Sequence, residues 1–255
     1  MTGVGMGEAA TDRQVAVMTG KAALPFLQGL VTNDVLPLAK GPGIVWTAML
    51  SPQGKYLADF FVVNTGDALL LDLPASVAEA TLRRLALYRL RAEVQIAPVE
   101  MTVTRGLGAA PPGALPDPRH AALGWRGYGL PATDAAAIDW TAIRVEHLIP
   151  ETGAELVPDD SYILEMGFER LHGVDFRKGC YVGQEVTARM RHKTALKKGL
   201  MQVRLEGEAE PGTPILQGER PAGTLHSIAG DRALAWLRFD RTEELVAGGA
   251  RVYPD

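Results

Sequence analysis

The residues best suited to chemistry in this chain lie at positions 177–185, Arg-Lys-Gly-Cys-Tyr-Val-Gly-Gln-Glu. Cys180 is the only cysteine among 255 residues, and Lys178 precedes it by two positions. A thiolate is both a nucleophile and a metal ligand, and nearby cations or a helix N-terminus favour it over the thiol. The spacing therefore predicts an activated or metal-contacting cysteine on a tight loop that leads into a helix. The alternative is that Cys180 is an ordinary small buried residue.

The histidines argue against a cysteine hydrolase, which needs a histidine base within reach of the thiol. His172 and His192 flank Cys180 without a diagnostic spacing, and the other histidines are scattered along the chain. No histidine pair has the spacing of a metal site, and one cysteine supplies neither a Cys₄ site nor an intrachain disulfide. We therefore expect no stably bound metal ion.

Basic residues gather after the thiol, at Arg189, Arg191, Lys193, Lys197 and Lys198. Such a run is either a solvated helix face or a binding site for anionic groups, such as the carboxylates of a polyglutamate tail. Gln184 and Glu185 either cap the start of the helix or present polar groups to a ligand. The residues alone leave both pairs of alternatives open.

The overall composition is that of an ordinary globular protein, with 47% hydrophobic and 22% charged residues and a net charge of −4. This acidic balance argues against nucleic acid as a partner. No run of about 18 apolar residues occurs, so we expect no membrane partner. The first eight residues lack a basic region followed by an apolar core, so we expect no secretory signal and a cytoplasmic location.

The periodicity predicts an α+β protein that ends in a small β-barrel. Strands are expected at 14–18, 44–50, 56–64, 68–73, 92–96 and 99–104, with a Ser-Pro-Gln-Gly turn at 51–54. Helices are expected at 75–90, at 134–148 with Thr133 as N-cap, and at 185–193. Short strands punctuated by glycines follow residue 199, which is typical of a small barrel.

The chain resembles the YgfZ family, because residues 178–185 match the family signature Lys-Gly-Cys-(Tyr/Phe)-x-Gly-Gln-Glu at every position. These are folate-binding proteins related to the T-protein, the aminomethyltransferase of the glycine cleavage system. The resemblance extends over nearly the whole chain, through blocks at 26–35, 50–55, 117–119, 123–126, 186–189 and 233–238.

This resemblance implies an α+β fold of aminomethyltransferase type, with three parts arranged in a ring and a folate site near the central opening. Two parts would be α+β and ferredoxin-like, and the third a small C-terminal β-barrel. Residues 1–40 and 116–195 would form a discontinuous first part that carries the motif. Residues 41–115 would form the inserted second part, and residues 196–255 the barrel.

The family function implied for this chain is support of iron–sulfur cluster assembly or repair in selected client enzymes, with tetrahydrofolate or another folate form as cofactor. Lys178 and Cys180 carry over as the residues most tied to activity. The residues expected to contact folate are Tyr181, Gly183, Gln184, Glu185, Arg189, Arg126 and Asn33.

We expect the chain not to be a conventional enzyme. The alternative is a tetrahydrofolate-dependent one-carbon transferase that resembles the aminomethyltransferase. That activity uses a carboxylate, which has no clear counterpart in this sequence; Glu79 lies nearest in a rough alignment, so a true aminomethyltransferase is disfavoured.

Overall fold

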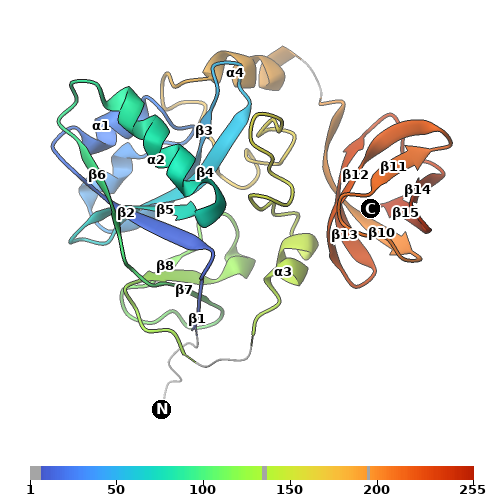
Figure 1. The fold of residues 1–255 in the computed structure, drawn as a ribbon, viewed down its shortest axis with the longest axis horizontal. Helices are drawn as coiled ribbons and strands as arrows, with labels where there is room; N and C mark the ends of the chain where they lie inside the picture. The colour runs from blue at the N-terminus through green and yellow to red at the C-terminus, as the bar shows by residue number, and fades with distance from the viewer. Residues whose placement is uncertain (1–6, 134–136, 194–195) are drawn as a thin grey trace.

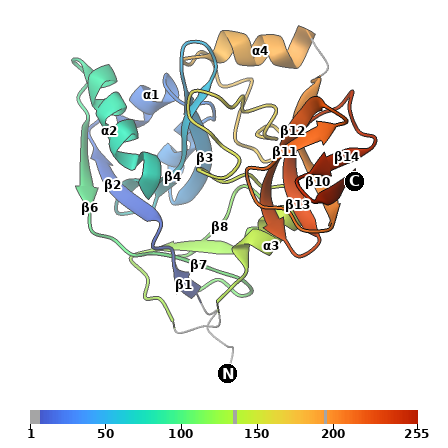
Figure 2. The ribbon, with the colours of Figure 1, turned by 45° about the vertical axis from the view of Figure 1, so that its right-hand side comes forward.

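The structure is a computed structural model that describes residues 7–133, 137–193 and 196–255, and these residues form three β-sheets flanked by short helices (Figure 1). Two of the sheets lie side by side at one end of the molecule, and the third closes into a barrel at the other end (Figures 1 and 2). The expected α+β class with a C-terminal barrel is therefore confirmed.

The larger sheet is antiparallel and has the strand order β3-β4-β5-β2-β6. Its strands are β2 (Arg13–Thr19), β3 (Gly43–Leu50), β4 (Tyr56–Asn64), β5 (Leu69–Pro74) and β6 (Gln95–Val99). The predicted turn joins β3 to β4, where the Gly54 N–H donates to the Ser51 carbonyl at 2.8 Å. The other connections include α1 (Ala23–Gln28), the 3₁₀ helix η1 (Leu36–Lys40) and α2 (Ala75–Arg89).

Helix α2 packs against the larger sheet through a stripe of apolar residues at helical spacing. Ala78 and Leu85 on the helix are fully buried in one cluster with Phe60 and Leu71 of the sheet. The alternation of β4 and β5 sends the other side chains, such as Phe61 and Leu70, into a second cluster shared with the motif region. This sheet therefore separates two cores.

The smaller sheet has the order β1-β7-β9-β8, formed by β1 (Gly7–Ala9), β7 (Val103–Gly106), β8 (Leu115–Pro116) and β9 (Trp125–Tyr128). The 3₁₀ helix η2 (Ala121–Leu123) precedes β9, and α3 (Trp140–Glu146) follows it. The helix expected at 134–148 is thus shorter than predicted, and residues 134–136 lie outside the described part. Asp139, not Thr133, caps it, because its Oδ1 accepts the Ala142 N–H at 2.8 Å.

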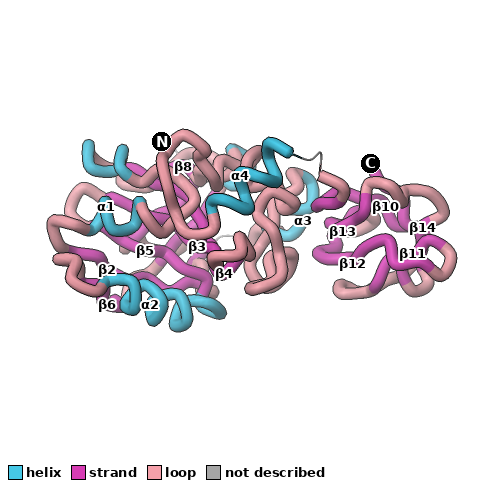
Figure 3. Tube along the Cα trace, turned by 90° about the horizontal axis from the view of Figure 1, so that it is seen from above, coloured by secondary structure: helices cyan, strands magenta, loops and turns pink. Residues whose placement is uncertain are grey.

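The barrel closes in the order β10-β13-β12-β11-β14-β15. Its strands are β10 (Lys198–Glu206), β11 (Pro214–Gln217), β12 (Arg220–Ala229), β13 (Arg232–Arg238), β14 (Leu245–Ala247) and β15 (Ala250–Pro254). Seen from above, it stands apart from the two open sheets (Figure 3). The buried Glu155 connects it to α3, because its carboxylate accepts from Arg144 Nη1 and from the Ser227 N–H, each at 3.2 Å.

The pairing of β2 bears on the expected division of the chain. Strand β2 lies between β5 and β6, so residues 13–19 share a sheet with strands from 43–99. A boundary at residues 40 and 41 therefore does not separate one sheet from another. The three residue ranges given above for the parts stay a prediction.

A buried carboxylate joins the two open sheets. Asp72 of β5 pairs with Arg13 of β2 at 2.7 Å and with Arg126 of β9 at 2.6 Å, and it accepts the Tyr128 hydroxyl at 2.9 Å. Burial alone would raise the pKa of Asp72, but the charges of the two arginines outweigh it and lower that pKa to about 2. The carboxylate is therefore ionised and is the counterion of both arginines.

Replacing Asp72 by Asn keeps the side-chain shape and leaves Arg13 and Arg126 buried without this counterion. We expect the free energy of unfolding in urea at neutral pH to fall by about 3–5 kcal/mol, the range for removing one partner of a buried ion pair. In the unchanged protein, the stabilisation from Asp72 is present above its ordinary pKa of 3.8 and is lost as the pH falls toward about 2. Asp72→Asn should lack this part of the acid transition.

Asp240→Asn is the matched control, because Asp240 pairs with Arg238 at 2.9 Å on the surface. Exposed pairs contribute little to stability, so its urea midpoint should match that of the unchanged protein. A midpoint for Asp72→Asn as high as that of Asp240→Asn would show that the buried pair does not hold the sheets together.

Candidate functional site

The motif forms an exposed loop that ends at the start of helix α4 (Gln184–Lys193). Cys180 is exposed, which excludes the alternative of an ordinary buried cysteine. Gly179 and Gly183 on either side have φ of +97° and +83°, a left-handed conformation that glycine adopts without a steric penalty. The two glycines thus set the path of the loop and hold the thiol at the surface.

Lys178 anchors the loop rather than presenting a free amine beside the thiol. Its Nζ donates to the Val31 carbonyl at 2.7 Å and also to the carbonyl of Gln28, the last residue of α1. In return, Gln28 Nε2 donates to the Lys178 carbonyl at 3.2 Å. Burial lowers the pKa of Lys178 to about 8, although the nearby Asp34, Asp175 and Cys180 oppose this shift.

Tyr181 and Gly183 fasten the other end of the loop. Tyr181 is buried in the same cluster as Trp46 and Phe168, and burial raises its pKa to about 12. Its hydroxyl has no hydrogen-bond partner within the described ranges. A Cβ added to Gly183 would lie 2.6 Å from the Ser51 carbonyl oxygen, so the start of α4 rests directly on the β3–β4 turn.

The exposed face of α4 is mostly paired within the chain. Arg189 binds Glu185 one turn earlier at 2.8 Å, with both side chains largely in solvent. Arg191 binds Glu169 at 2.7 Å and lies over the Phe176 ring at 4.0 Å. The side chain of Lys193 lies outside the described residues. This pattern fits the solvated-face interpretation better than a binding site for carboxylates.

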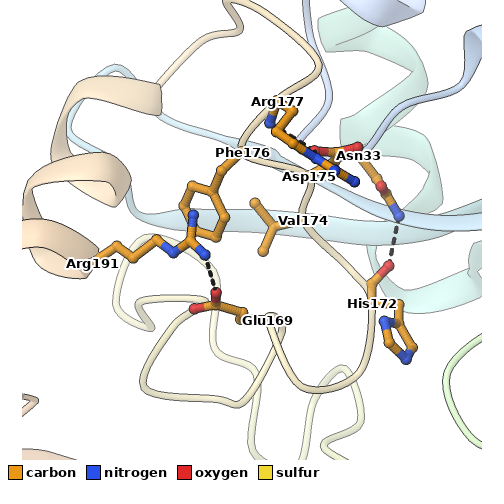
Figure 4. Close-up of a pocket in the computed structure, with 8 residues that line it drawn as sticks. All are labelled: Asn33, Glu169, His172, Val174, Asp175, Phe176, Arg177 and Arg191. Carbon is orange, nitrogen blue, oxygen red and sulfur yellow. Dashed lines mark hydrogen bonds and ion pairs between the residues drawn. The ribbon is translucent and has the colours of Figure 1, made fainter.

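A cavity of about 510 Å³ lies beside the motif and is lined by Asn33, Glu169, His172, Val174, Asp175, Phe176, Arg177 and Arg191 (Figure 4). Asn33 is committed to the backbone, because its Nδ2 donates to the His172 carbonyl at 2.6 Å and to the Trp46 carbonyl at 2.8 Å. Asn33 therefore holds the segment before the motif against β3, and its side-chain donors are used in doing so.

A second cavity of about 270 Å³ lies between the barrel and residues 155–166, and sequence reasoning missed it. Its polar lining includes Glu165, Lys198 and Lys55, and Trp236 contributes an aromatic ring. Glu165 accepts the Trp236 indole N–H at 3.1 Å and lies 3.8 Å from Lys198 Nζ. Burial raises the pKa of Glu165, although these two neighbours partly oppose the shift.

The seven residues expected to contact folate do not converge on one cavity. Asn33 lines the first cavity, whereas none of the seven lines the second. Arg126 is buried and paired with Asp72, so it serves as a structural cation. Glu79, the carboxylate nearest in sequence to that of the aminomethyltransferase, lies exposed on α2 and pairs with Arg83. One sequence signal for Glu165 was its position as a single acid between apolar Leu164 and Met166.

The arrangement of sheets and barrel defines a protein of the aminomethyltransferase fold with one exposed thiol. The structure of the glycine cleavage system aminomethyltransferase T from Bartonella henselae matches it with a TM-score of 0.75, covering 99% of this chain and 85% of that one. The two share 14% sequence identity, so this likeness establishes the fold alone.

Sequence comparison gives the family. Residues 197–255 match the CAF17 C-terminal β-barrel domain. The mitochondrial iron–sulfur cluster assembly factor IBA57 of Homo sapiens is 31% identical over 88% of this chain and 75% of its own length. IBA57 of Mus musculus is 30% identical over 89% and 76%. The chain therefore belongs to the IBA57 family of iron–sulfur cluster assembly factors.

Coverage is lower for the IBA57 homologue of Mycosarcoma maydis, which is 27% identical over 85% of this chain and 59% of its own length. All three relatives are named as mitochondrial proteins, so the expected cytoplasmic location is wrong by this comparison. The resemblance to the YgfZ family in particular stays a prediction. No helix in the described ranges is long and apolar enough to cross a membrane.

The contact between the motif and the β3–β4 turn can be tested by comparing two glycines. Gly183→Ala and Gly179→Ala each place a side chain at positive φ, which costs about 1–2 kcal/mol. Only Gly183→Ala adds a clash, because a Cβ at Gly179 would meet nothing within 4 Å. We expect Gly183→Ala to lower the free energy of unfolding by about 1–3 kcal/mol more than Gly179→Ala. Equal losses in urea denaturation would contradict the contact.

Proposed function

We propose that this protein supports the assembly or repair of iron–sulfur clusters and that Cys180 is the thiol it contributes. The observation that carries this proposal is the exposure of the only cysteine on a loop fixed by Lys178 and two glycines. Thiolates are the usual ligands of iron–sulfur clusters. The names of the mammalian relatives, iron–sulfur cluster assembly factors, point to the same activity.

One thiol cannot hold a cluster alone, because the common clusters take four cysteine ligands. No group of three or more His, Cys, Asp or Glu side chains suited to a metal ion occurs among the residues described. A cluster handled by Cys180 would therefore need its other ligands from a second protein. This fits a surface thiol, since a partner can approach it directly, and it makes client enzymes the expected partners.

We propose further that tetrahydrofolate, or another folate form, binds in the cavity that Glu165 lines. The donor set fits this group: a pterin ring presents adjacent N–H donors that a carboxylate accepts, and Trp236 supplies an aromatic wall. Lys55 and Lys198 supply cations for the carboxylates of the glutamate tail. Each ammonium has three N–H donors, so the contacts of Lys55 with the Asp160 carbonyl and of Lys198 with Glu165 leave others for the ligand. The volume of about 270 Å³ is just below the usual range for small-molecule sites, so the tail would extend into solvent.

This assignment moves the folate site away from the motif residues. Tyr181 is packed in the core and Gly183 rests on a turn. The side-chain donors of Asn33 are used by backbone carbonyls, the buried Arg126 is paired with Asp72, and Arg189 does not line this cavity. A cavity formed by the barrel and the loop at 155–166 also agrees better with a ligand near a central opening between the parts of the fold.

A folate-dependent one-carbon transferase is the second candidate, and Glu165 is the observation that favours it. Its carboxylate faces the cavity, and burial raises its pKa, as is common for groups that transfer protons. This candidate predicts formation of methylene-tetrahydrofolate from a methylamine-type donor. The maintenance function predicts binding of folate without such turnover.

The folate proposal predicts a specific loss of affinity in Glu165→Gln. Removing the negative charge weakens hydrogen bonds that contribute about 1.5–3 kcal/mol each, so the Kd for tetrahydrofolate should rise about 10- to 100-fold. Isothermal titration calorimetry measures this change. Glu169→Gln, in the cavity beside the motif, is the matched control and should bind folate normally. Normal binding by Glu165→Gln would exclude this site.

The thiol proposal predicts that Cys180→Ser loses the ability to support iron–sulfur enzymes in cells that lack the native protein. The exposed position means that the variant should fold normally and bind tetrahydrofolate as tightly as the unchanged protein. The activity of an iron–sulfur enzyme in cell extracts, the urea midpoint and the Kd for tetrahydrofolate measure these three properties. Full support by Cys180→Ser would show that the loop has only a structural role.

A further inference from the structure

The end of helix α2 that faces away from the barrel exposes large apolar side chains to solvent. Leu87 and Leu90 are 73% and 87% exposed, and Tyr88 beside them is 36% exposed. The connection from α2 to β6 lies at the outer margin of the molecule in both ribbon views (Figures 1 and 2). Exposed apolar side chains that cluster in this way mark interaction surfaces more often than isolated ones do.

The backbone at Leu90 adds a second cost. Leu90 ends helix α2 with a φ of +43°, a region that favours glycine. Glycine or asparagine commonly occupies such a position after a helix, whereas this chain has leucine. A leucine in this conformation is strained, and its side chain gains nothing in water. Burial of the Leu90 side chain against a partner would remove the cost of its exposure, and the free energy gained would offset the backbone strain.

The surrounding charge is positive. Residues 83–93 contain Arg83, Arg84, Arg89 and Arg91 and one acidic residue, the exposed Glu93, although the whole chain carries a net charge of −4. Arg83 pairs with Glu79, whereas the other three form no ion pair with a carboxylate in the described part of the chain. The one hydrogen bond of the Arg89 side chain to a described residue is long, 3.5 Å to the Val94 carbonyl. We call Leu87, Tyr88, Arg89, Leu90 and Arg91 the arginine–leucine tip, because all five are exposed, whereas the partly buried Arg84 lines a cavity beside Asp159.

We propose that the arginine–leucine tip binds the surface of an anionic lipid bilayer, with the leucines entering the interface and the arginines contacting lipid phosphates. Arginine pairs well with phosphate oxygens, and each basic residue near an anionic membrane favours binding. A flat surface suits a projecting tip, whereas a protein partner would need a matching hollow. The expectation of no membrane partner rested on the lack of a spanning segment, and a surface contact does not require one.

Cosedimentation with lipid vesicles tests the proposal. The full chain should bind vesicles of phosphatidylcholine and phosphatidylserine, should release them at high salt, and should not bind phosphatidylcholine alone. Leu87→Ser combined with Leu90→Ser should weaken binding at least about tenfold, because two apolar side chains no longer enter the interface. Arg89→Gln and Arg91→Gln should each weaken it about fivefold.

Matched controls come from the barrel, at the other end of the molecule. Val246→Ser combined with Arg220→Gln removes an exposed apolar group and an exposed cation there, and it should leave vesicle binding unchanged. Thermal unfolding verifies that each variant folds. Cys180→Ser should also bind vesicles normally, which separates this proposal from the one about the thiol.

Two results would overturn the assignment. Equal binding to vesicles with and without phosphatidylserine, or no binding to either, would exclude an anionic bilayer as the partner. Tighter binding to a polyglutamate peptide than to the anionic vesicles, with the same loss in the leucine and arginine variants, would assign the tip to an acidic protein instead.

Discussion

The fold depends on one carboxylate that is out of reach of water. Asp72 carries its charge at zero exposure because Arg13 and Arg126 bring the opposite charges from two different sheets. Taking three such groups out of water is costly, and only correct geometry offsets that cost. The sheets therefore have one favourable relative position. Phe61 reinforces it, since the guanidinium of Arg126 lies 4.2 Å from the centre of its ring.

The motif loop is attached to this framework by contacts between residues far apart in the sequence. The Thr32 hydroxyl donates to the Gly173 carbonyl at 2.7 Å and accepts the Ala48 N–H at 2.9 Å. Lys178 makes a similar link to the end of α1. The segment around residues 28–34 thus holds the chain both before and at the motif. The position of the thiol is set by the N-terminal part of the protein, about 150 residues away from it in sequence.

The fold class, the β3–β4 turn, helices α2 and α4 and the barrel followed from periodicity and turn residues, because those signals are local. The roles of single side chains did not. Arg126 resembled a ligand residue, yet its partner Asp72 lies 54 positions earlier. Lys178 lies close to Cys180, as the sequence suggests. Its amine, however, donates to the carbonyls of Gln28 and Val31, whose positions beside it depend on the fold and not on the local sequence. The position of Glu165 in a cavity could not be predicted from the sequence, because barrel residues such as Trp236 form the facing wall of that cavity.

Because Cys180 is exposed, the thiol is open to oxidation and must be reduced again for the protein to work. An accessible thiol can be oxidised to a sulfenic acid, which is normally rescued by condensation with a second, resolving cysteine. The sequence contains no second cysteine, so no internal disulfide can form. Recovery of an oxidised Cys180 must therefore come from outside, through a small-molecule thiol or a cysteine of another protein. The working life of the molecule is then tied to the reducing capacity of its compartment.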